Sequence, residues 1–153
     1  MSLSAVKGNF VQFAFIVLSL AVCAALADML PSVFGLGMPV LLGAAVFFAV
    51  ETRAPVWLVA AVAAGALEES VAALPPATAI VFFVALATAV RFFRVPLAWI
   101  LAAYPAYQVW IGLVADGSGA VSRIVLSLPV GAIALAVVVA ALSVSWRKAG
   151  ADA

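Results

Sequence analysis

The chain has 153 residues, of which 69% are hydrophobic and only 8% are charged, and its net charge is +1. A soluble domain carries charge on about a quarter of its residues, so this composition excludes an ordinary water-exposed surface. The small net charge excludes a basic surface for nucleic acid, and the absence of histidine removes the commonest general base and metal ligand. We therefore expect neither enzymatic activity nor a cofactor.

Six stretches without Asp, Glu, Lys or Arg fill nearly the whole chain. Most of them approach the ~20 residues that an α-helix needs to cross a ~30 Å hydrocarbon layer. They are residues 8–27, 29–50, 54–67, 70–90, 95–115 and 124–146. The pattern predicts an all-α, polytopic membrane protein in which residues 1–153 form a single six-helix transmembrane domain.

The first span is predicted at about Phe10–Ala27, and it contains Cys23, the single cysteine of the chain. One cysteine excludes an internal disulfide. The apolar run is longer than the central region of a usual signal peptide. Cleavage after one of the small residues near Ala27 is the alternative interpretation.

The second and third spans follow a turn rich in Pro and Gly. The second is predicted at about Leu36–Val50, and the third runs from Pro55 to about Ala73. Proline suits the first turn of a helix, because its missing N–H would be unpaired there anyway.

The last three spans are also separated by helix breakers. Pro75-Pro76 opens the fourth, which runs to about Val95, and Pro96 opens the fifth, which ends near Ala115. A loop at residues 116–119 precedes the sixth span, at about Ile124–Trp146.

The basic residues predict the orientation. With six crossings, one side carries Lys7, Arg53, Arg91, Arg94, Arg147 and Lys148, and the other carries Arg123. This asymmetry fits the positive-inside rule and places both termini in the cytoplasm. A five-crossing alternative, which omits the short third span, divides the basic residues with no such bias.

Glu68 and Glu69 lie close to the outer end of the third span. Ionisable groups at such a depth are expensive and are functional-site hypotheses by default. Both carboxylates could instead be interfacial, if the helix ends at Leu67. Arg123, the only basic residue predicted on that side, is the expected ion-pair partner of one of them.

Further polar atoms come from Tyr107 and Gln108 in the fifth span, at the level of the two glutamates. They could line a small cavity open to the outside, or form hydrogen bonds between helices. Pro105, just before them, favours a kink in this span.

Small residues four positions apart are typical of closely packed membrane helices. The third span carries Ala61 and Gly65, and the sixth carries Ala132, Ala136 and Ala140. These faces are predicted to pack within the bundle or against a partner.

Three segments together resemble the MreD family, the rod-shape-determining membrane proteins of bacteria. They are Gly65-Ala66-Leu67-Glu68-Glu69 with the following Leu74-Pro75-Pro76, the stretch Val90-Arg91-Phe92-Phe93-Arg94, and the basic loop Thr52-Arg53-Ala54-Pro55. The chain departs from the family at Glu69, where the family usually has Asp, and in its Pro-Pro turn.

The resemblance implies a non-enzymatic scaffold of the bacterial inner membrane. Such a protein would bind the membrane-anchored protein MreC and couple MreB filaments to the peptidoglycan synthase that elongates the cell. The family is also similar in fold to the substrate-binding subunits of energy-coupling-factor vitamin transporters. A membrane subunit that binds a small, vitamin-like solute from the outer side is therefore the alternative function.

Overall fold

The computed structural model of the protein describes residues 3–29, 39–53, 55–93, 102–116 and 121–151. Within these ranges every regular element is helical, which confirms the predicted all-α fold class. The elements are α1 (Leu3–Met29), α2 (Val40–Glu51), α3 (Val56–Ala72), α4 (Thr78–Phe93), α6 (Ala103–Ile111), the π-helical η1 (Gly112–Asp116) and α7 (Val121–Ala151).

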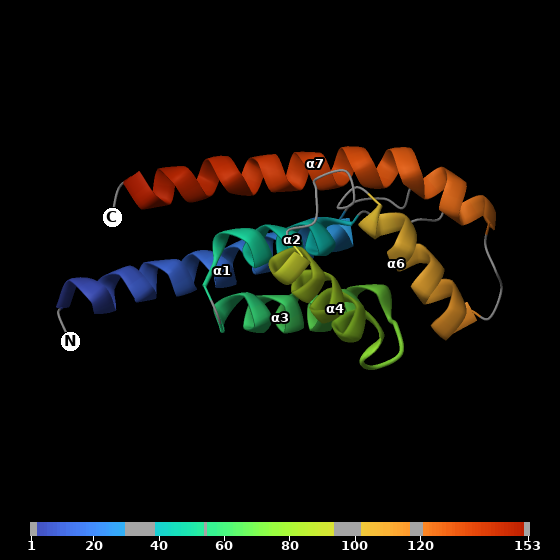
Figure 1. Cartoon of the computed structure of the whole chain (residues 1–153), viewed down its shortest axis with the longest axis horizontal. Helices are drawn as coiled ribbons and strands as arrows, with labels where there is room; N and C mark the ends of the chain where they lie inside the picture. The colour runs from blue at the N-terminus through green and yellow to red at the C-terminus, as the bar shows by residue number, and fades with distance from the viewer. Residues whose placement is uncertain (1–2, 30–38, 54, 94–101, 117–120, 152–153) are drawn as a thin grey trace.

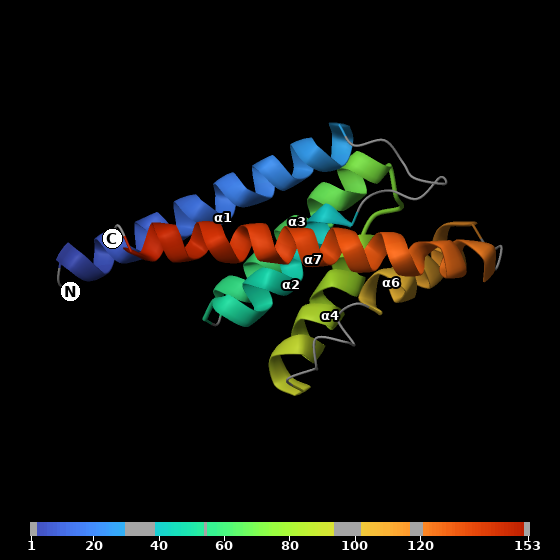
Figure 2. The ribbon, with the colours of Figure 1, turned by 90° about the horizontal axis from the view of Figure 1, so that it is seen from above.

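The two longest helices, α1 and α7, run antiparallel along the molecule, and the shorter helices pack against them (Figure 1). The beginning of α1 and the end of α7 lie at the same end of the molecule in both views (Figures 1 and 2). The turn between α3 and α4 and the helix α6 lie toward the other end.

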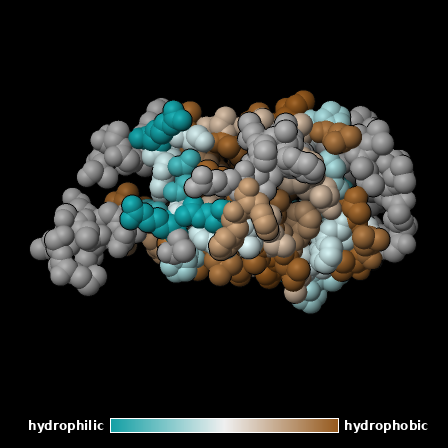
Figure 3. Space-filling view, viewed as in Figure 1, coloured by the Kyte–Doolittle hydropathy of each residue, from teal (hydrophilic) through white to brown (hydrophobic). Residues whose placement is uncertain are grey.

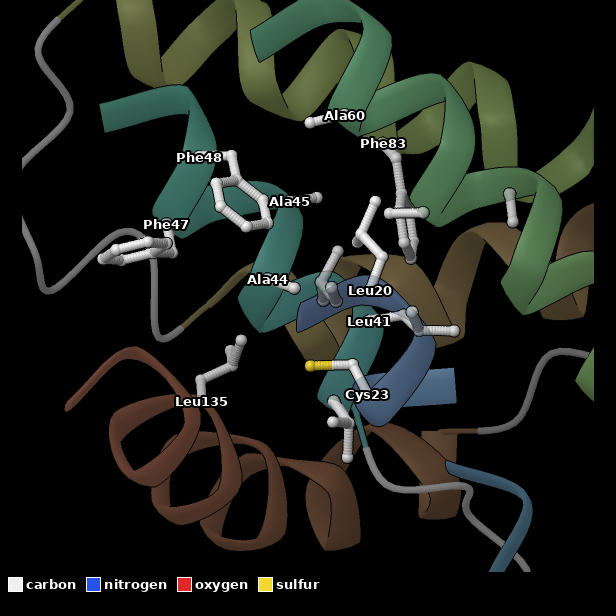
Figure 4. Close-up of a cluster of buried hydrophobic side chains, with 14 of the residues drawn as sticks. Leu20, Cys23, Leu41, Ala44, Ala45, Phe47, Phe48, Ala60, Phe83 and Leu135 are labelled. Atoms are coloured by element: carbon white, nitrogen blue, oxygen red, sulfur yellow. The ribbon is translucent and has the colours of Figure 1, made fainter. Parts of the chain in front are cut away.

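Helix α2 forms the centre of the core. Every residue from Val40 to Ala49 is buried, because α1, α3, α4 and α7 all pack against this helix. Figure 4 shows the contacts: Phe48 of α2 lies near Ala60 and Phe83, and Leu135 of α7 lies on another side of α2. A helix that is apolar on every side is expected to be enclosed in this way.

From Phe10 to Met29, helix α1 is also strongly apolar, but most of this segment is exposed. It packs through Ile16, Leu20 and Cys23, whereas side chains such as Phe13 and Leu18 are 62% and 67% exposed. In water such a surface would be strongly unfavourable, since it leaves large apolar groups unburied.

Within the described residues, one helical segment is long and apolar enough to cross a membrane, namely Phe10–Met29. Only 22% of its most apolar part is buried, unlike a core helix of a soluble protein, although N-terminal signal sequences share its length and composition. Three other apolar segments are shorter: Val40–Glu51, Thr78–Phe93 and Gly131–Arg147. The six-crossing topology stays a prediction.

Some predicted boundaries can be compared with the structure. Helix α3 ends at Ala72, beside the predicted end at Ala73. Pro105, predicted to kink the fifth span, lies instead in the first turn of α6, where its missing N–H leaves no intrahelical bond unmade. The predicted helix starts at Leu36 and Pro96 and most of the loop at residues 116–119 lie outside the described residues.

Candidate functional site

Glu69 holds together the end of α3 and the beginning of α4. Its Oε1 atom accepts hydrogen bonds from the backbone N–H groups of Ala79, at 2.9 Å, and Ile80, at 3.0 Å. Its Oε2 atom accepts a third from the N–H of Ala77, at 3.0 Å. The first N–H groups of a helix have no intrahelical partner and favour negative charge. Glu69 therefore caps α4 from the neighbouring helix.

The turn between α3 and α4 brings these groups together through two unusual backbone conformations. Ala73 and Ala77 have φ values of 50° and 67°, in the left-handed region that residues with a Cβ rarely adopt. The N–H of Leu74 donates to the backbone carbonyl of Glu69 at 3.1 Å and closes the end of α3. Pro75-Pro76 then prevents the helix from continuing.

Glu68 faces a different neighbour, the tyrosine Tyr107 of α6. Tyr107 is 2% exposed, and its ring packs against Phe82 and Phe83 of α4, with centroid distances of 5.1 and 5.4 Å. Its hydroxyl lies near the Glu68 carboxyl but forms no hydrogen bond of standard geometry within the described part of the chain. A buried hydroxyl normally has a partner, so this one is a site at which a polar group could bind.

The other polar side chains of α6 have partners. The hydroxyl of Tyr104, one turn before Gln108, interacts with the Gln108 side chain. The Trp110 indole N–H donates to the backbone carbonyl of Thr78, in the first turn of α4, at 2.9 Å. The role of Trp110 was not predicted from the sequence, although a half-buried indole N–H normally needs a hydrogen-bond acceptor.

At one end of the bundle the structure brings together Glu68, Glu69, Tyr107 and Gln108. The sequence predicts the last two at the level of the glutamates. Arg123 belongs to the first turn of α7, but its side chain is outside the described part of the structure. The predicted ion pair with a glutamate therefore stays a prediction. The described residues include no group of three or more His, Cys, Asp and Glu side chains that could hold a metal ion.

The predicted packing residues divide between the two helices that carry them. On α3, Ala61 is fully buried, and a Cβ at Gly65 would lie 2.6 Å from Cα of Ile80. The backbones of α3 and α4 are therefore in direct contact there, as in small-residue helix interfaces.

On α7, Ala132 is half-buried and Ala136 is exposed, so this ridge faces outward along part of its length. The close contact on α7 is made by Gly131, where a Cβ would meet the Tyr104 ring at 2.3 Å. The contact at Gly131 was not predicted from the sequence, because a single glycine in an alanine-rich helix shows no distinctive spacing.

The opposite end of the bundle also uses a polar side chain between helices. Arg91, in the last turn of α4, reaches the last backbone carbonyls of α2, with Nη1 at 3.5 Å from the Ala49 oxygen and 3.4 Å from the Val50 oxygen. A cation at a helix C-terminus interacts favourably with the helix dipole.

Comparison with known proteins provides no relative: no family model matches the chain, and no curated protein or solved structure is significantly similar to it. Its function therefore has to be argued from the arrangement of its residues.

Proposed function

We propose that the chain is a multi-pass protein of the bacterial inner membrane, with six crossings and both termini in the cytoplasm, that acts as a non-enzymatic scaffold like MreD. The observation that carries the proposal is the distribution of polar and apolar groups. Large apolar side chains face outward on most helices, whereas the polar groups near the glutamates hold helices to one another.

The membrane location is supported by the outward faces of the helices. Exposed large apolar residues occur on every described α-helix, among them Phe13, Val59, Val81, Val109 and Val137. In the face shown in Figure 3, hydrophobic residues cover the middle of the molecule and the strongly hydrophilic ones gather toward one end. A lipid layer is the environment in which such a belt is stable, since helices satisfy their own backbone groups there.

The even number of crossings is supported by the contacts at the basic end. Arg91 reaches the end of α2, and Trp146, next to Arg147, packs edge-on against Phe47 of α2 and Phe15 of α1. Arg91 of α4 and the Trp146-Arg147 pair of α7 therefore lie near the end of α2, and Trp146 is at the level of Phe15 in the middle of α1. This clustering is what the positive-inside rule expects of one cytoplasmic side.

The scaffold role is supported by the hydrogen bonds that the polar side chains make between helices. Glu69 accepts three backbone hydrogen bonds, and Trp110 donates one to another helix. These groups stabilise the bundle and are not poised for chemistry on a substrate. The outward helix faces then provide the apolar surface through which the protein acts, and packing of helix against helix in lipid is the interaction that such a surface permits.

Topology reporters and partner capture test this proposal. Reporters fused at residues 1 and 153 should both indicate the cytoplasm, and opposite compartments would refute the six-crossing model. Crosslinking in intact cells should recover a single-span membrane partner, and deletion of the gene should change cell width. Purification without such a partner, combined with unchanged width, would refute the scaffold.

Substitutions at the two glutamates sharpen the test. Glu69→Leu should weaken partner capture, but the structure indicates that it also removes the cap of α4. Glu68→Gln leaves that cap intact, so it tests the carboxylate near Tyr107 separately. Loss of capture with Glu68→Gln at unchanged thermal stability would place the partner at this end of the bundle.

One observation favours the alternative, a subunit that binds a small solute. The buried Tyr107 hydroxyl makes no hydrogen bond of standard geometry within the described residues, and the Glu68 carboxyl lies beside it, so the two groups could together bind a polar solute. Equilibrium dialysis with vitamin-like compounds tests this function. Binding that Tyr107→Phe abolishes would support it, and saturable binding by none of the compounds would count against it.

A further inference from the structure

A groove lies between α1 and α7, and neither glutamate lines it. Its volume is about 390 Å³, and its floor includes Val40 of α2. The α1 wall extends from Phe15 to Leu26 and the α7 wall from Val137 to Ser145. The two helices run antiparallel along the groove (Figures 1 and 2).

The lining of the groove matches hydrocarbon. Most of its walls are Val, Leu, Phe and Ala side chains, and its polar atoms come from Ser19, Ser145 and Cys23. From Phe15 to Leu26 the helix rises about 16 Å at 1.5 Å per residue. This length is about half of a ~30 Å hydrocarbon layer, which is the depth of one leaflet.

One end of the groove is marked by positive charge. Phe15 and Trp146 close the groove there with an edge-to-face contact, at a centroid distance of 5.1 Å. The next residue, Arg147, is exposed, Lys148 follows it, and Lys7 lies in the second turn of α1 at the same end. Basic residues between membrane helices on the cytoplasmic side attract anionic headgroups.

We propose that this groove binds one anionic glycerophospholipid of the inner leaflet, with an acyl chain between α1 and α7 and the headgroup at Arg147. The inference rests on the membrane location proposed above and is independent of the scaffold role. On this proposal, one lipid binds specifically in the groove, whereas the rest of the outer surface contacts bulk lipid nonspecifically.

The volume and the charge together favour a lipid over a protein occupant. The part of the ligand that enters the groove is one acyl chain, which is much narrower than a helix. Three turns of a partner helix, about 10 Å wide and 16 Å long, occupy roughly 1,300 Å³, far more than the 390 Å³ of the groove. A second copy inserted in the same orientation would bring its own basic end to the same level, where like charges repel. An anionic headgroup instead complements these charges.

Lipid binding by the purified full-length chain tests the proposal. The probes are dioleoyl phosphatidylglycerol, which is anionic, and dioleoyl phosphatidylcholine, which is zwitterionic, added to the delipidated protein in micelles. Native mass spectrometry should detect one tightly bound phosphatidylglycerol per chain and weaker binding of phosphatidylcholine. Equal retention of both lipids would overturn the proposal.

Substitutions at two neighbouring alanines distinguish lipid binding in the groove from lipid binding elsewhere on the surface. Ala141 lines the groove and Ala140 does not, and both are exposed. Ala141→Phe should fill the groove and weaken phosphatidylglycerol binding about tenfold, the equivalent of two lost methylene contacts. Ala140→Phe should leave binding unchanged. Equal effects of the two substitutions would overturn the proposal.

The headgroup contact is tested at the surface, where folding is not at risk. Arg147→Gln should weaken phosphatidylglycerol binding about fivefold and leave phosphatidylcholine binding unchanged, since one basic residue near an anionic surface contributes about that factor. Arg53→Gln, another exposed arginine outside the groove, is the control. An equal effect of Arg53→Gln would indicate nonspecific charge attraction and overturn the headgroup assignment.

The outcomes distinguish this inference from the proposed function. A chain that binds phosphatidylglycerol as described but captures no protein partner refutes the scaffold and supports the lipid site. A chain whose reporters show six crossings but whose Ala141→Phe variant retains phosphatidylglycerol refutes the lipid site alone. A dimer in nanodiscs that Ala141→Phe breaks would assign the groove to a second copy and overturn the proposal.

Discussion

The two ends of the helix bundle use their charged residues in opposite ways. At the acidic end, the Glu69 carboxylate turns inward and binds three backbone N–H groups at the start of α4. At the basic end, Arg53 and Arg147 are exposed, and Arg91 makes only long contacts with the carbonyls at the end of α2.

The difference indicates which charged residues stabilise the fold and which determine how the folded protein is oriented in the membrane. A carboxylate that replaces missing helix hydrogen bonds is part of the folded structure, because the same N–H groups, two of them partly buried, would otherwise lose their protein partner. Exposed arginines contribute little to stability but interact strongly with a membrane surface. Substitutions at the acidic end should therefore change stability, and those at the basic end should chiefly change lipid binding or orientation.

The largest effect is expected from Gly65→Val, one turn before Glu69. A Cβ there would lie 2.6 Å from Cα of Ile80, and backbone cannot move aside as a side chain can. We expect a loss of about 3 kcal/mol in the free energy of unfolding, at the upper end for overpacked positions. Denaturation of the protein in micelles measures it. Ala66→Val, at an exposed neighbour, should change stability little, and equal losses would contradict the close contact.

The second largest effect is expected from Glu69→Leu, with a loss of about 2 kcal/mol in the free energy of unfolding. The substitution removes three hydrogen bonds and the favourable interaction of a negative charge with the N-terminus of α4. Glu69→Gln retains an acceptor oxygen and should lose about half as much. Glu68→Gln should cause a smaller change still, since the three hydrogen bonds to the start of α4 all go to Glu69. Thermal unfolding of the three variants ranks them, and a larger loss for Glu68→Gln would reverse the assigned roles.

Much of the fold follows from the sequence, because helices in an apolar chain are bounded by charges and prolines. Pro75-Pro76 correctly indicates where α3 ends and α4 begins, whereas the charged pair Glu68-Glu69 lies inside α3, so the alternative end at Leu67 is wrong. The different environments of α1 and α2 could not be predicted, since both are apolar on every side and only the packing of the other helices encloses α2. The number of membrane crossings likewise depends on the surrounding lipid. The sequence indicates it only through the uneven distribution of basic residues.

The candidate site was predictable in its location and not in its roles. The spacing of Glu68, Glu69 and Tyr107 indicated a common depth, but adjacent helical residues point about 100° apart. Which carboxylate meets α4 and which meets α6 depends on the rotation of α3, and Gly65 sets that rotation through its contact with Ile80. The cap by Glu69 also requires the left-handed turn residues Ala73 and Ala77, which no glycine marks in the sequence.

At the basic end, Arg91→Met should reduce stability by only about 1 kcal/mol. The long contacts to the Ala49 and Val50 carbonyls are partly exposed, so solvent replaces them at small cost, while methionine keeps much of the side-chain packing. The same denaturation measurement gives the value. Arg91→Lys keeps the charge, and its free energy of unfolding should be closer to that of the original protein. A loss as large as that of Glu69→Leu would remove the distinction between the two ends.

The smallest effect is expected from Ala73→Gly, and it should be stabilising. At φ 50° the Cβ of Ala73 is crowded by the backbone, and glycine relieves this strain of about 1–2 kcal/mol. Glycine also has more freedom in the unfolded chain, which opposes the gain and leaves about 0.5 kcal/mol. Ala66→Gly, at an exposed position inside α3, should instead lose about 1 kcal/mol. Opposite signs for two chemically identical substitutions, measured by thermal unfolding, would show that the left-handed turn beneath the Glu69 cap is strained; equal losses would show that it is not.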